Sequence, residues 1–304
     1  MSGHSKGPID GRTAAALLVT LVLWASAFAG IRVALEGYPP GSVALLRFLV
    51  ASAVLAVYAV VARIRLPDAR DMPAIVVLGF LGVTVYHLGL SYGEVTVTAG
   101  AASLLIASGP VFTALLAVAV LGERLRTWGW LGIAVSVAGV TLVTLGEGGG
   151  LHLDARAFLI LLAALSTAFY FVYQKPYLSR YNALEFTAYC IWAGTAFMLC
   201  FLPQLVGSAG RAPLEATLAL VYLGVFPAAV AYVTWTYALS RAPASIVAST
   251  LYLVPPLAIA IAWLWRKEIP SLLSLAGGAI ALVGVIMVTG SHAEAVTEDS
   301  DSTS

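Results

Sequence analysis

The chain has 304 residues, of which 61% are Ala, Val, Ile, Leu, Met, Phe, Trp, Tyr or Cys and only 10% are charged. Soluble chains carry about 25% charged residues, and a soluble core cannot absorb this much apolar side chain. The 16 Lys and Arg residues nearly balance the 15 Asp and Glu residues, so the net charge of +1 leaves no basic face for nucleic acid. The composition therefore excludes a soluble domain and a nucleic-acid partner, and it predicts a protein embedded in a lipid bilayer.

Apolar segments long enough to cross a bilayer follow one another along the chain. We expect ten transmembrane helices, at residues 13–34, 42–62, 72–92, 97–121, 128–146, 155–174, 183–206, 214–239, 244–265 and 271–290. Residues 1–12 and the acidic residues 291–304 form polar tails that are too hydrophilic to pack and should be disordered. The predicted fold class is an all-α polytopic membrane protein.

The sequence aligns with itself over long stretches, without a gap, when it is shifted by 145 residues. Gly79 then falls on Gly224, and Pro110 falls on Pro255. The alignment predicts two five-helix repeats, at residues 13–146 and 155–290. Because each repeat has an odd number of helices, the second must enter the membrane upside down relative to the first. Such inverted repeats are typical of transporters.

The distribution of Lys and Arg predicts the orientation in the membrane. With the N-terminus inside, ten of these residues lie on the inner side and five on the outer side, and Arg47 lies within a helix. We therefore expect a multi-pass protein of the cell (inner) membrane with both termini in the cytoplasm.

Several motifs occur in the same order in both halves of the chain. They are Trp24–Phe28, Pro40, Arg47, Pro110 and Leu121–Leu125 in the first half, and Tyr232, Trp235, Tyr237–Leu239, Ala242–Ser245, Pro255 and Glu268 in the second. Across residues 13–290 the chain resembles the ten-helix EamA-type proteins of the drug/metabolite transporter superfamily, and most of all the bacterial amino acid exporters of the YddG kind. The resemblance implies a central cavity and export of small metabolites by alternating access. One departure is Arg266-Lys267-Glu268, which stands where the second half should repeat Leu-Gly-Glu.

Aromatic and polar side chains inside the predicted helices are candidates for contact with a substrate. They are Trp24, Phe28, Tyr86, His87, Ser103, Tyr170, Tyr173, Tyr232, Trp235 and Tyr252. Such aromatic rings also form belts at the membrane surface, and His87 could be a hydrogen-bonded packing residue rather than a substrate contact or a proton-sensitive gate. A mostly apolar pocket suits zwitterionic solutes better than phosphorylated ones, which would require more Lys and Arg inside the spans.

Other residues have predicted structural roles. Pro110 and Pro255 lie in the middle of expected helices, where they are candidate hinges or tolerated kinks. We expect Arg47 to form a structural ion pair with Glu36 or Glu94, with an anion-binding role as the alternative. Glu123 and Glu268 would stabilise the starts of the helices that follow them, with ion coupling as the alternative. Glycines seven residues apart should allow close helix packing; they are Gly132, Gly139, Gly277 and Gly284.

The sequence thus predicts a secondary transporter that exports small metabolites, most of all aromatic or neutral amino acids. Its expected partners are an amino acid-like substrate and the lipid bilayer, and we expect a monomer. A passive channel is the first alternative, and an intramembrane enzyme is the second. Zinc protease chemistry would need two His and a Glu on one helix, whereas a single His lies within the spans. No nucleotide-binding loop is present, so we do not expect transport to be driven by ATP. We also expect no cofactor and no metal.

Overall fold

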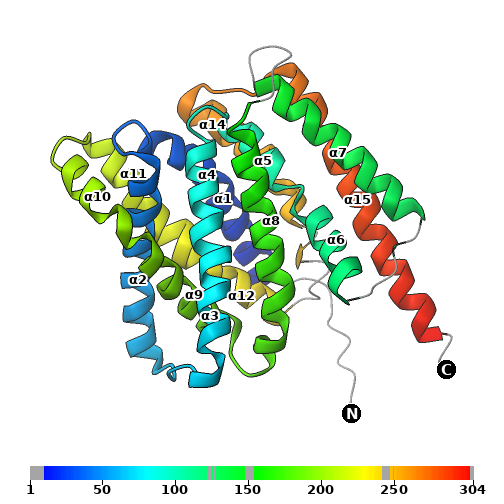
Figure 1. Ribbon diagram of the computed structural model, residues 1–304, viewed down its shortest axis with the longest axis horizontal. Helices are drawn as coiled ribbons and strands as arrows, with labels where there is room; N and C mark the ends of the chain where they lie inside the picture. Colours follow the sequence, from blue (N-terminus) through cyan, green and yellow to red (C-terminus); the bar gives the residue numbers. More distant parts are fainter. Residues whose placement is uncertain are drawn as a thin grey trace.

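The computed structural model describes residues 10–121, 125, 127–147, 154–241, 247–248 and 250–301. Within this part of the chain, the regular elements are all helical (Figure 1). The first half contains α1 (Gly11–Ala34), α2 (Pro40–Ala62), η1 (Ala69–Asp71), α3 (Met72–Gly79), η2 (Phe80–Val85), α4 (Tyr86–Gly93), α5 (Ala99–Ile106), α6 (Gly109–Leu121) and α7 (Thr127–Glu147).

The second half contains α8 (Ala157–Gln174), η3 (Lys175–Ser179), α9 (Ala183–Met198), η4 (Leu199–Phe201), α10 (Leu202–Ala209), α11 (Leu214–Val225), η5 (Phe226–Val230), α12 (Ala231–Arg241), η6 (Thr250–Leu253), α14 (Val254–Arg266) and α15 (Leu272–Asp301). Among the described residues, nine helical stretches are long and apolar enough to cross a membrane, and Thr250–Arg266 is a shorter apolar one. Each coincides with one of the ten predicted segments, so the predicted fold class is confirmed.

Local sequence explains where several helices begin and end. The carboxylate of Asp10 accepts a hydrogen bond from the Thr13 backbone N–H at 2.8 Å and so caps α1. Asn182 and Glu185 form a capping box at the start of α9. Lys267 takes a left-handed backbone conformation and ends α14, with φ of 56°. Polar residues between the spans therefore set the helix boundaries that the apolar pattern leaves open.

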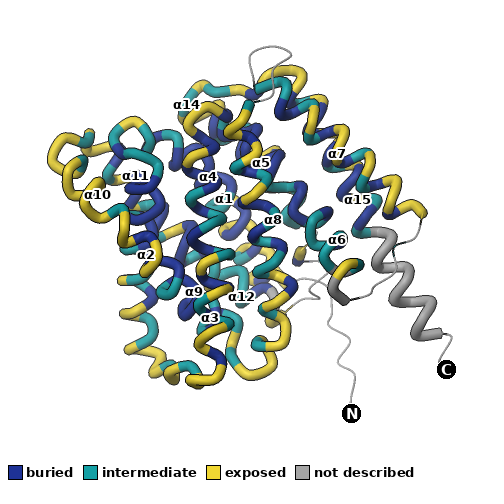
Figure 2. Tube along the Cα trace, viewed as in Figure 1, coloured by how far each residue is buried: buried dark blue, intermediate teal, exposed yellow. Residues whose placement is uncertain are grey.

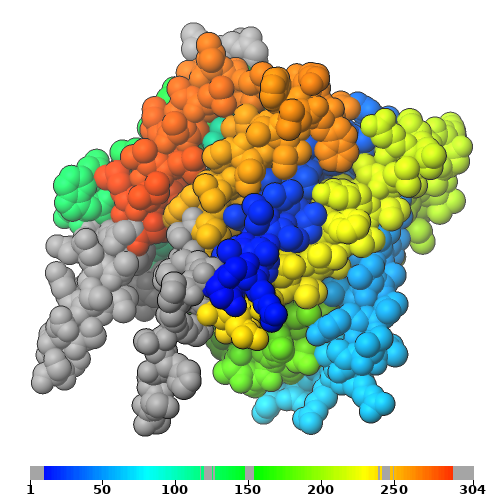
Figure 3. All heavy atoms as spheres, turned by 180° about the vertical axis from the view of Figure 1, so that it is seen from behind, coloured from blue at the N-terminus to red at the C-terminus, as the bar shows by residue number. Residues whose placement is uncertain are grey.

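Helices at corresponding positions of the two halves make reciprocal contacts. The helix α1 packs against α11 and α12, and its counterpart α8 packs against η2 and α4. In the same way α2 packs against α9, and α5 packs against α14. Figure 3 shows α1 between α14 on one side and the α11–α12 region on the other. Each half therefore completes the packing of the other, and most of the buried core lies where they meet (Figure 2).

The pair α7 and α15 lies at one side of the bundle, and the two helices run along each other (Figure 1). A methyl group built on Gly277 would lie 2.7 Å from the carbonyl oxygen of Gly139, and one on Gly132 would lie 2.8 Å from that of Gly284. These backbones contact each other directly, which is the close helix packing that the glycine spacing predicts.

The helix α15 continues to Asp301, and this differs from the sequence-based expectation. Residues 291–304 were expected to be disordered, whereas the backbone of residues 291–301 is helical. The segment contains two Ala, two Glu and no Pro, so its residues extend a helix that has already formed.

Two kinds of irregularity interrupt the spans at corresponding places in the two halves. The third and eighth spans each contain a π-helical segment, η2 and η5, where continuous α-helix was expected. The fourth span breaks between α5 and α6, and the ninth changes from η6 to α14. π-Helical turns inside α-helices are frequently associated with functional sites.

Candidate substrate site

The π-helical segments anchor each half of the bundle to the other. In η2 the carbonyl oxygen of Leu81 accepts a hydrogen bond from the Ser166 hydroxyl of α8 at 2.9 Å. In η5 the carbonyl oxygen of Pro227 accepts one from the Trp24 indole N–H of α1 at 3.2 Å. The widened turns thus leave carbonyl groups that side chains of the partner helix satisfy. Candidate substrate contacts begin directly after these segments, at Tyr86 in α4 and Tyr232 in α12.

Three predicted aromatic residues come together between α1 and α12. The ring of Trp24 lies 5.7 Å from that of Tyr232, edge to face, and 5.2 Å from that of Trp235. Edge-to-face and tilted aromatic pairs at these distances are favourable. The three side chains are partly buried, so they form an aromatic surface inside the bundle.

A second group of side chains lies between α2 and α4. The imidazole of His87 lies 4.3 Å from the Phe48 ring and 4.5 Å from the Tyr86 ring, measured between ring centroids. His87 is buried, and its Nδ1 atom has no hydrogen-bond partner among the described residues. The guanidinium of Arg47 lies over the Phe48 ring, at 5.5 Å from its centroid.

The two groups border the same buried core. Tyr86 and Tyr232, one from each half of the chain, both pack against it, and α2, which carries Arg47, contacts η5 just before α12. We refer to the combined set as the central cluster, which consists of Trp24, Arg47, Tyr86, His87, Tyr232 and Trp235. It combines aromatic faces, phenol groups, an imidazole and one cation.

Other predicted substrate residues lie apart from the central cluster. Phe28 is buried in the main core, and the hydroxyl of Ser103 donates to the Gly100 carbonyl within its own helix at 2.6 Å. Tyr170 packs against the small core near Phe186, and Tyr173 is exposed and stacks on Phe169.

Tyr252 also lies apart, because its hydroxyl bonds Thr289 of α15 at 3.0 Å. Its ring packs against a small core formed by α6 and α15. Periodicity along one helix predicted Ser103 and Tyr252 for the substrate site, but it could not show which neighbouring helix each faces.

The prediction that Arg47 forms an ion pair with Glu36 or Glu94 is wrong. Glu36 pairs instead with Arg266, with 2.5 Å between Nη2 and Oε1. Both carboxylate oxygens of Glu94 are buried without a hydrogen-bond partner among the described residues, and neither lies within 4.0 Å of Arg47. The guanidinium of Arg47 lies instead over the ring of Phe48, at 5.5 Å from its centroid.

The two prolines occupy helix starts and do not kink continuous helices. Pro110 is the second residue of α6, and Pro255 is the second residue of α14. In the first turn of a helix the missing N–H of proline breaks no hydrogen bond. The interruptions lie just before these helix starts, at residues 107–108 and at η6.

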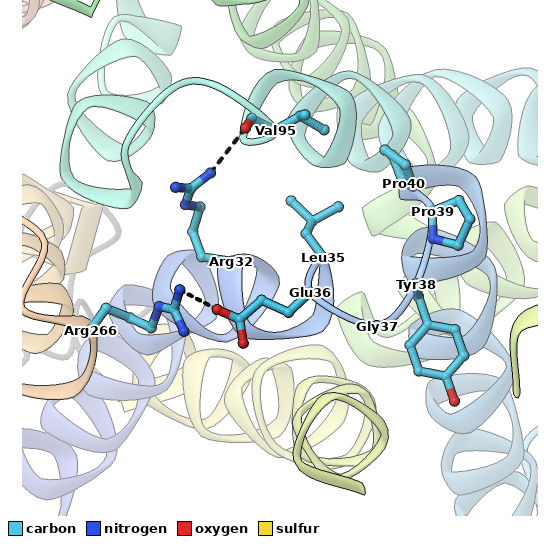
Figure 4. Close-up of a pocket in the computed structure, with 9 residues that line it drawn as sticks. All are labelled: Arg32, Leu35, Glu36, Gly37, Tyr38, Pro39, Pro40, Val95 and Arg266. Carbon is cyan, nitrogen blue, oxygen red and sulfur yellow. Dashed lines mark hydrogen bonds and ion pairs between the residues drawn. The ribbon is translucent and has the colours of Figure 1, made fainter. Parts of the chain in front are cut away.

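Charged residues at the end of the bundle where α1 and α14 finish form a layer that sequence reasoning missed. Arg32 pairs with Glu268 at 3.2 Å and donates to the Glu94 carbonyl at 2.5 Å and the Val95 carbonyl at 3.2 Å. Arg266 pairs with Glu36, as Figure 4 shows. We call Arg32, Glu36, Arg266 and Glu268 the ion-pair layer. Of these four residues, Arg32, Glu36 and Arg266 line a pocket of about 510 Å³.

The ion-pair layer explains the departure from Leu-Gly-Glu in the second half. Arg266 and Glu268 each reach a residue of opposite charge near the end of α1, so the extra charge links α14 to α1. The role expected for Glu268 at the start of the tenth span is therefore corrected, because its carboxylate binds Arg32. Ser271 instead caps α15, through a 3.0 Å bond from the Ser274 N–H. Glu123 lies outside the described residues.

Comparison with known proteins decides the class of this bundle. Residues 12–145 and 155–290 match the EamA-like transporter family. The chain belongs to the EamA-like transporter family. It is a multi-pass membrane transporter, and the two matching segments correspond to the two halves of the bundle. Within the described residues no group of three His, Cys, Asp or Glu is placed to hold a metal ion.

Relatives in this family share most of the chain. It is 45% identical to YdfC of Bacillus subtilis, an uncharacterized transporter, over 86% of each chain. It is 43% identical to a probable terminal-alkyne amino-acid exporter of Streptantibioticus cattleyicolor, over 90% of this chain and 92% of that one. A chain of known crystal structure matches the fold with a TM-score of 0.60 at 21% identity, covering 91% of this chain and 96% of the other.

Proposed function

We propose that this transporter exports amino acids with apolar or aromatic side chains by alternating access around the central cluster. The observation that carries the proposal is the composition of the cluster, which combines aromatic side chains from both halves with a buried cation and a buried imidazole. Apolar walls with a few polar groups suit a small zwitterion. The similarity to a probable terminal-alkyne amino-acid exporter supports the same substrate class.

Alternating access requires one end of the bundle to be closed while the other is open. We propose that the ion-pair layer closes the outer end, and that Pro110 and Pro255 mark the points where the broken helices bend. The layer joins α1 to α14 and to the backbone after α4, so it would have to break before a substrate leaves. Breaking the layer would shift the population from the state closed at the outer end to the state open there, as alternating access requires.

The substrate class is tested with purified protein in liposomes. Uptake of labelled leucine, phenylalanine, propargylglycine, aspartate and glucose 6-phosphate is measured, with protein-free liposomes as the control. We expect saturable uptake of the first three and none of the two anionic solutes. Uptake of glucose 6-phosphate in preference to the amino acids would contradict the proposal.

The orientation can be tested with a cysteine at Arg211, an exposed residue between α10 and α11. Cys190 and Cys200 are first replaced by alanine, since Cys200 is exposed and would react. With both termini in the cytoplasm, Arg211→Cys should react with an impermeant maleimide added to intact cells. Arg63→Cys, at the exposed end of α2, is the matched control and should react only after permeabilisation. The reverse pattern would place both termini outside.

Replacing Pro110 or Pro255 with alanine should slow transport several-fold while leaving the folded yield near that of the wild type. Alanine supplies the backbone N–H that proline lacks, so each interrupted span could form a longer continuous helix and become straighter and stiffer. Transport rate per folded molecule is the measurement. The matched control is Pro73→Ala, because Pro73 also lies in the first turn of a helix, α3, but not at a break within a span. Equal losses of yield and rate in the Pro110 and Pro255 variants would indicate misfolding and not a hinge.

A further inference from the structure

Arg47 is a buried cation without an anionic partner in the described part of the chain. Its residue surface is 6% exposed, and its Nε atom makes no hydrogen bond. Its one direct charge-related contact there is with the face of Phe48, at 5.5 Å. Ionisable side chains at membrane depth normally pair with an opposite charge or face a polar site. A buried charge left uncompensated is unfavourable, so an anion from outside the chain would stabilise this position.

No carboxylate of the described residues forms an ion pair with Arg47, and Glu94, which acts on it electrostatically, lies beyond 4.0 Å. Glu36 is bound to Arg266, and Glu268 is bound to Arg32. Glu94 directly follows the third span, and burial raises its pKa well above the usual range, which favours the uncharged acid. Within the described residues, the charge of Arg47 is therefore available to a ligand.

A second unsatisfied polar atom lies close to Arg47. Both Arg47 and His87 contact the ring of Phe48, and Nδ1 of His87 has no hydrogen-bond partner among the described residues. A neutral imidazole nitrogen can accept a hydrogen bond from an ammonium group. A cation that lacks an anion and an imidazole that lacks a donor together match the two charged ends of one zwitterion.

The chemistry of the side chain also favours a carboxylate ligand. A guanidinium presents N–H donors in a planar fork that matches the two oxygens of a carboxylate. The aromatic surface lies next to this position, since the ring of Tyr232 packs on Trp24 and α2, which carries Arg47, contacts η5 just before α12. The carboxylate and the side chain of one small amino acid can therefore meet their partners together.

Resting on the proposed export of amino acids, we infer that Arg47 binds the α-carboxylate of the transported amino acid. In this arrangement the ammonium group points toward His87, and the side chain lies against Trp24, Tyr232 and Trp235. Arg47 is then a specificity residue that separates amino acids from amines and amides of the same shape.

The test compares propargylglycine with its carboxamide, which keeps the shape and loses the negative charge. Binding to purified protein is measured by intrinsic tryptophan fluorescence, because Trp24 and Trp235 belong to the central cluster. Wild-type protein should bind the acid about tenfold to a hundredfold more tightly than the amide, as expected for hydrogen bonds to a charged group. Arg47→Gln should bind both compounds equally weakly. Arg211→Gln, which removes an exposed arginine, is the matched control and should behave as the wild type.

Different outcomes separate the inference from the proposed function. If wild-type protein binds neither form of propargylglycine, leucine or phenylalanine, the amino acid proposal fails and the inference fails with it. If wild-type protein binds acid and amide alike, or Arg47→Gln keeps the preference, the inference alone is overturned.

If Arg47→Gln does not fold, Arg47→Lys tests the contact between the guanidinium and the carboxylate. A lysine keeps the charge but loses the planar fork, so it should retain a preference for the acid with affinity weakened about tenfold. Wild-type affinity in Arg47→Lys would contradict a guanidinium–carboxylate contact. Folded yield and thermal unfolding are measured for each variant, so that a purely structural role is recognised.

Discussion

Gly277→Ala is expected to destabilise the folded transporter by about 1–3 kcal/mol, the usual cost of overpacking a tight interface. The new methyl group would lie 2.7 Å from both the Gly139 carbonyl oxygen and the Leu142 Cβ, and 2.8 Å from the Val143 nitrogen. Two of these three atoms belong to backbone and cannot rotate away. The helices α7 and α15 would therefore have to separate, and Gly277→Leu should prevent recovery of folded protein.

The matched control is Gly207→Ala. Gly207 lies in α10, and a methyl group built there has no neighbour within 4 Å. Because alanine is favoured over glycine in helices by up to about 1 kcal/mol, this variant should be as stable as the wild type or more so. Thermal unfolding in detergent, followed by size-exclusion chromatography, measures both. Equal stability of the two alanine variants would contradict direct backbone contact between α7 and α15.

Neutralising the ion-pair layer should open the outer end of the transporter. Glu36→Gln combined with Glu268→Gln removes both ion pairs, whose side chains are partly exposed. Partly exposed pairs contribute up to about 1 kcal/mol each, so losing both should raise the outward-open population about tenfold. The reporter is Ser91→Cys, a buried position one turn before Glu94, in a background without Cys190 and Cys200.

An impermeant thiol reagent added from the outside should label this cysteine about tenfold faster in the double variant than in the reporter protein with both ion pairs intact. The matched control exchanges the charges of one pair, as Glu36→Arg with Arg266→Glu. This variant keeps an ion pair at that position with reversed polarity, so its labelling should be slower than that of the double variant. If the double variant is labelled no faster than the reporter alone, the ion-pair layer does not close the outer end.

The sequence was sufficient for the positions of the spans, because a bilayer imposes both an apolar composition and a minimum length on every helix. It did not predict the π-helical segments, since Phe80–Val85 and Phe226–Val230 are as apolar as their surroundings. It placed Pro110 and Pro255 inside continuous helices, and the structure places both in the first turn of a new helix. A hydropathy pattern reports burial in lipid, and it carries no information on local helix geometry.

The candidate site was predictable where residue type alone constrains the environment. Trp24, Tyr232 and Trp235 were expected together and lie together. Ion pairing was not predictable, because Arg32 and Glu268 are 236 residues apart in the chain and meet only in the fold. The one signal in the sequence was the charged Arg266-Lys267-Glu268 segment in place of Leu-Gly-Glu.

Counterflow in liposomes tests the central claim of an alternating-access amino acid exporter most directly. Liposomes loaded with unlabelled leucine or propargylglycine are diluted into a trace of the same labelled compound, and internal label is followed with time. A carrier that alternates between two faces should accumulate label transiently above the external concentration, with saturable dependence on the internal amino acid. We expect this overshoot in the wild type, and we expect it to develop more slowly in Pro110→Ala and Pro255→Ala. Monotonic equilibration at a rate independent of the internal amino acid would indicate a passive channel and would contradict the account.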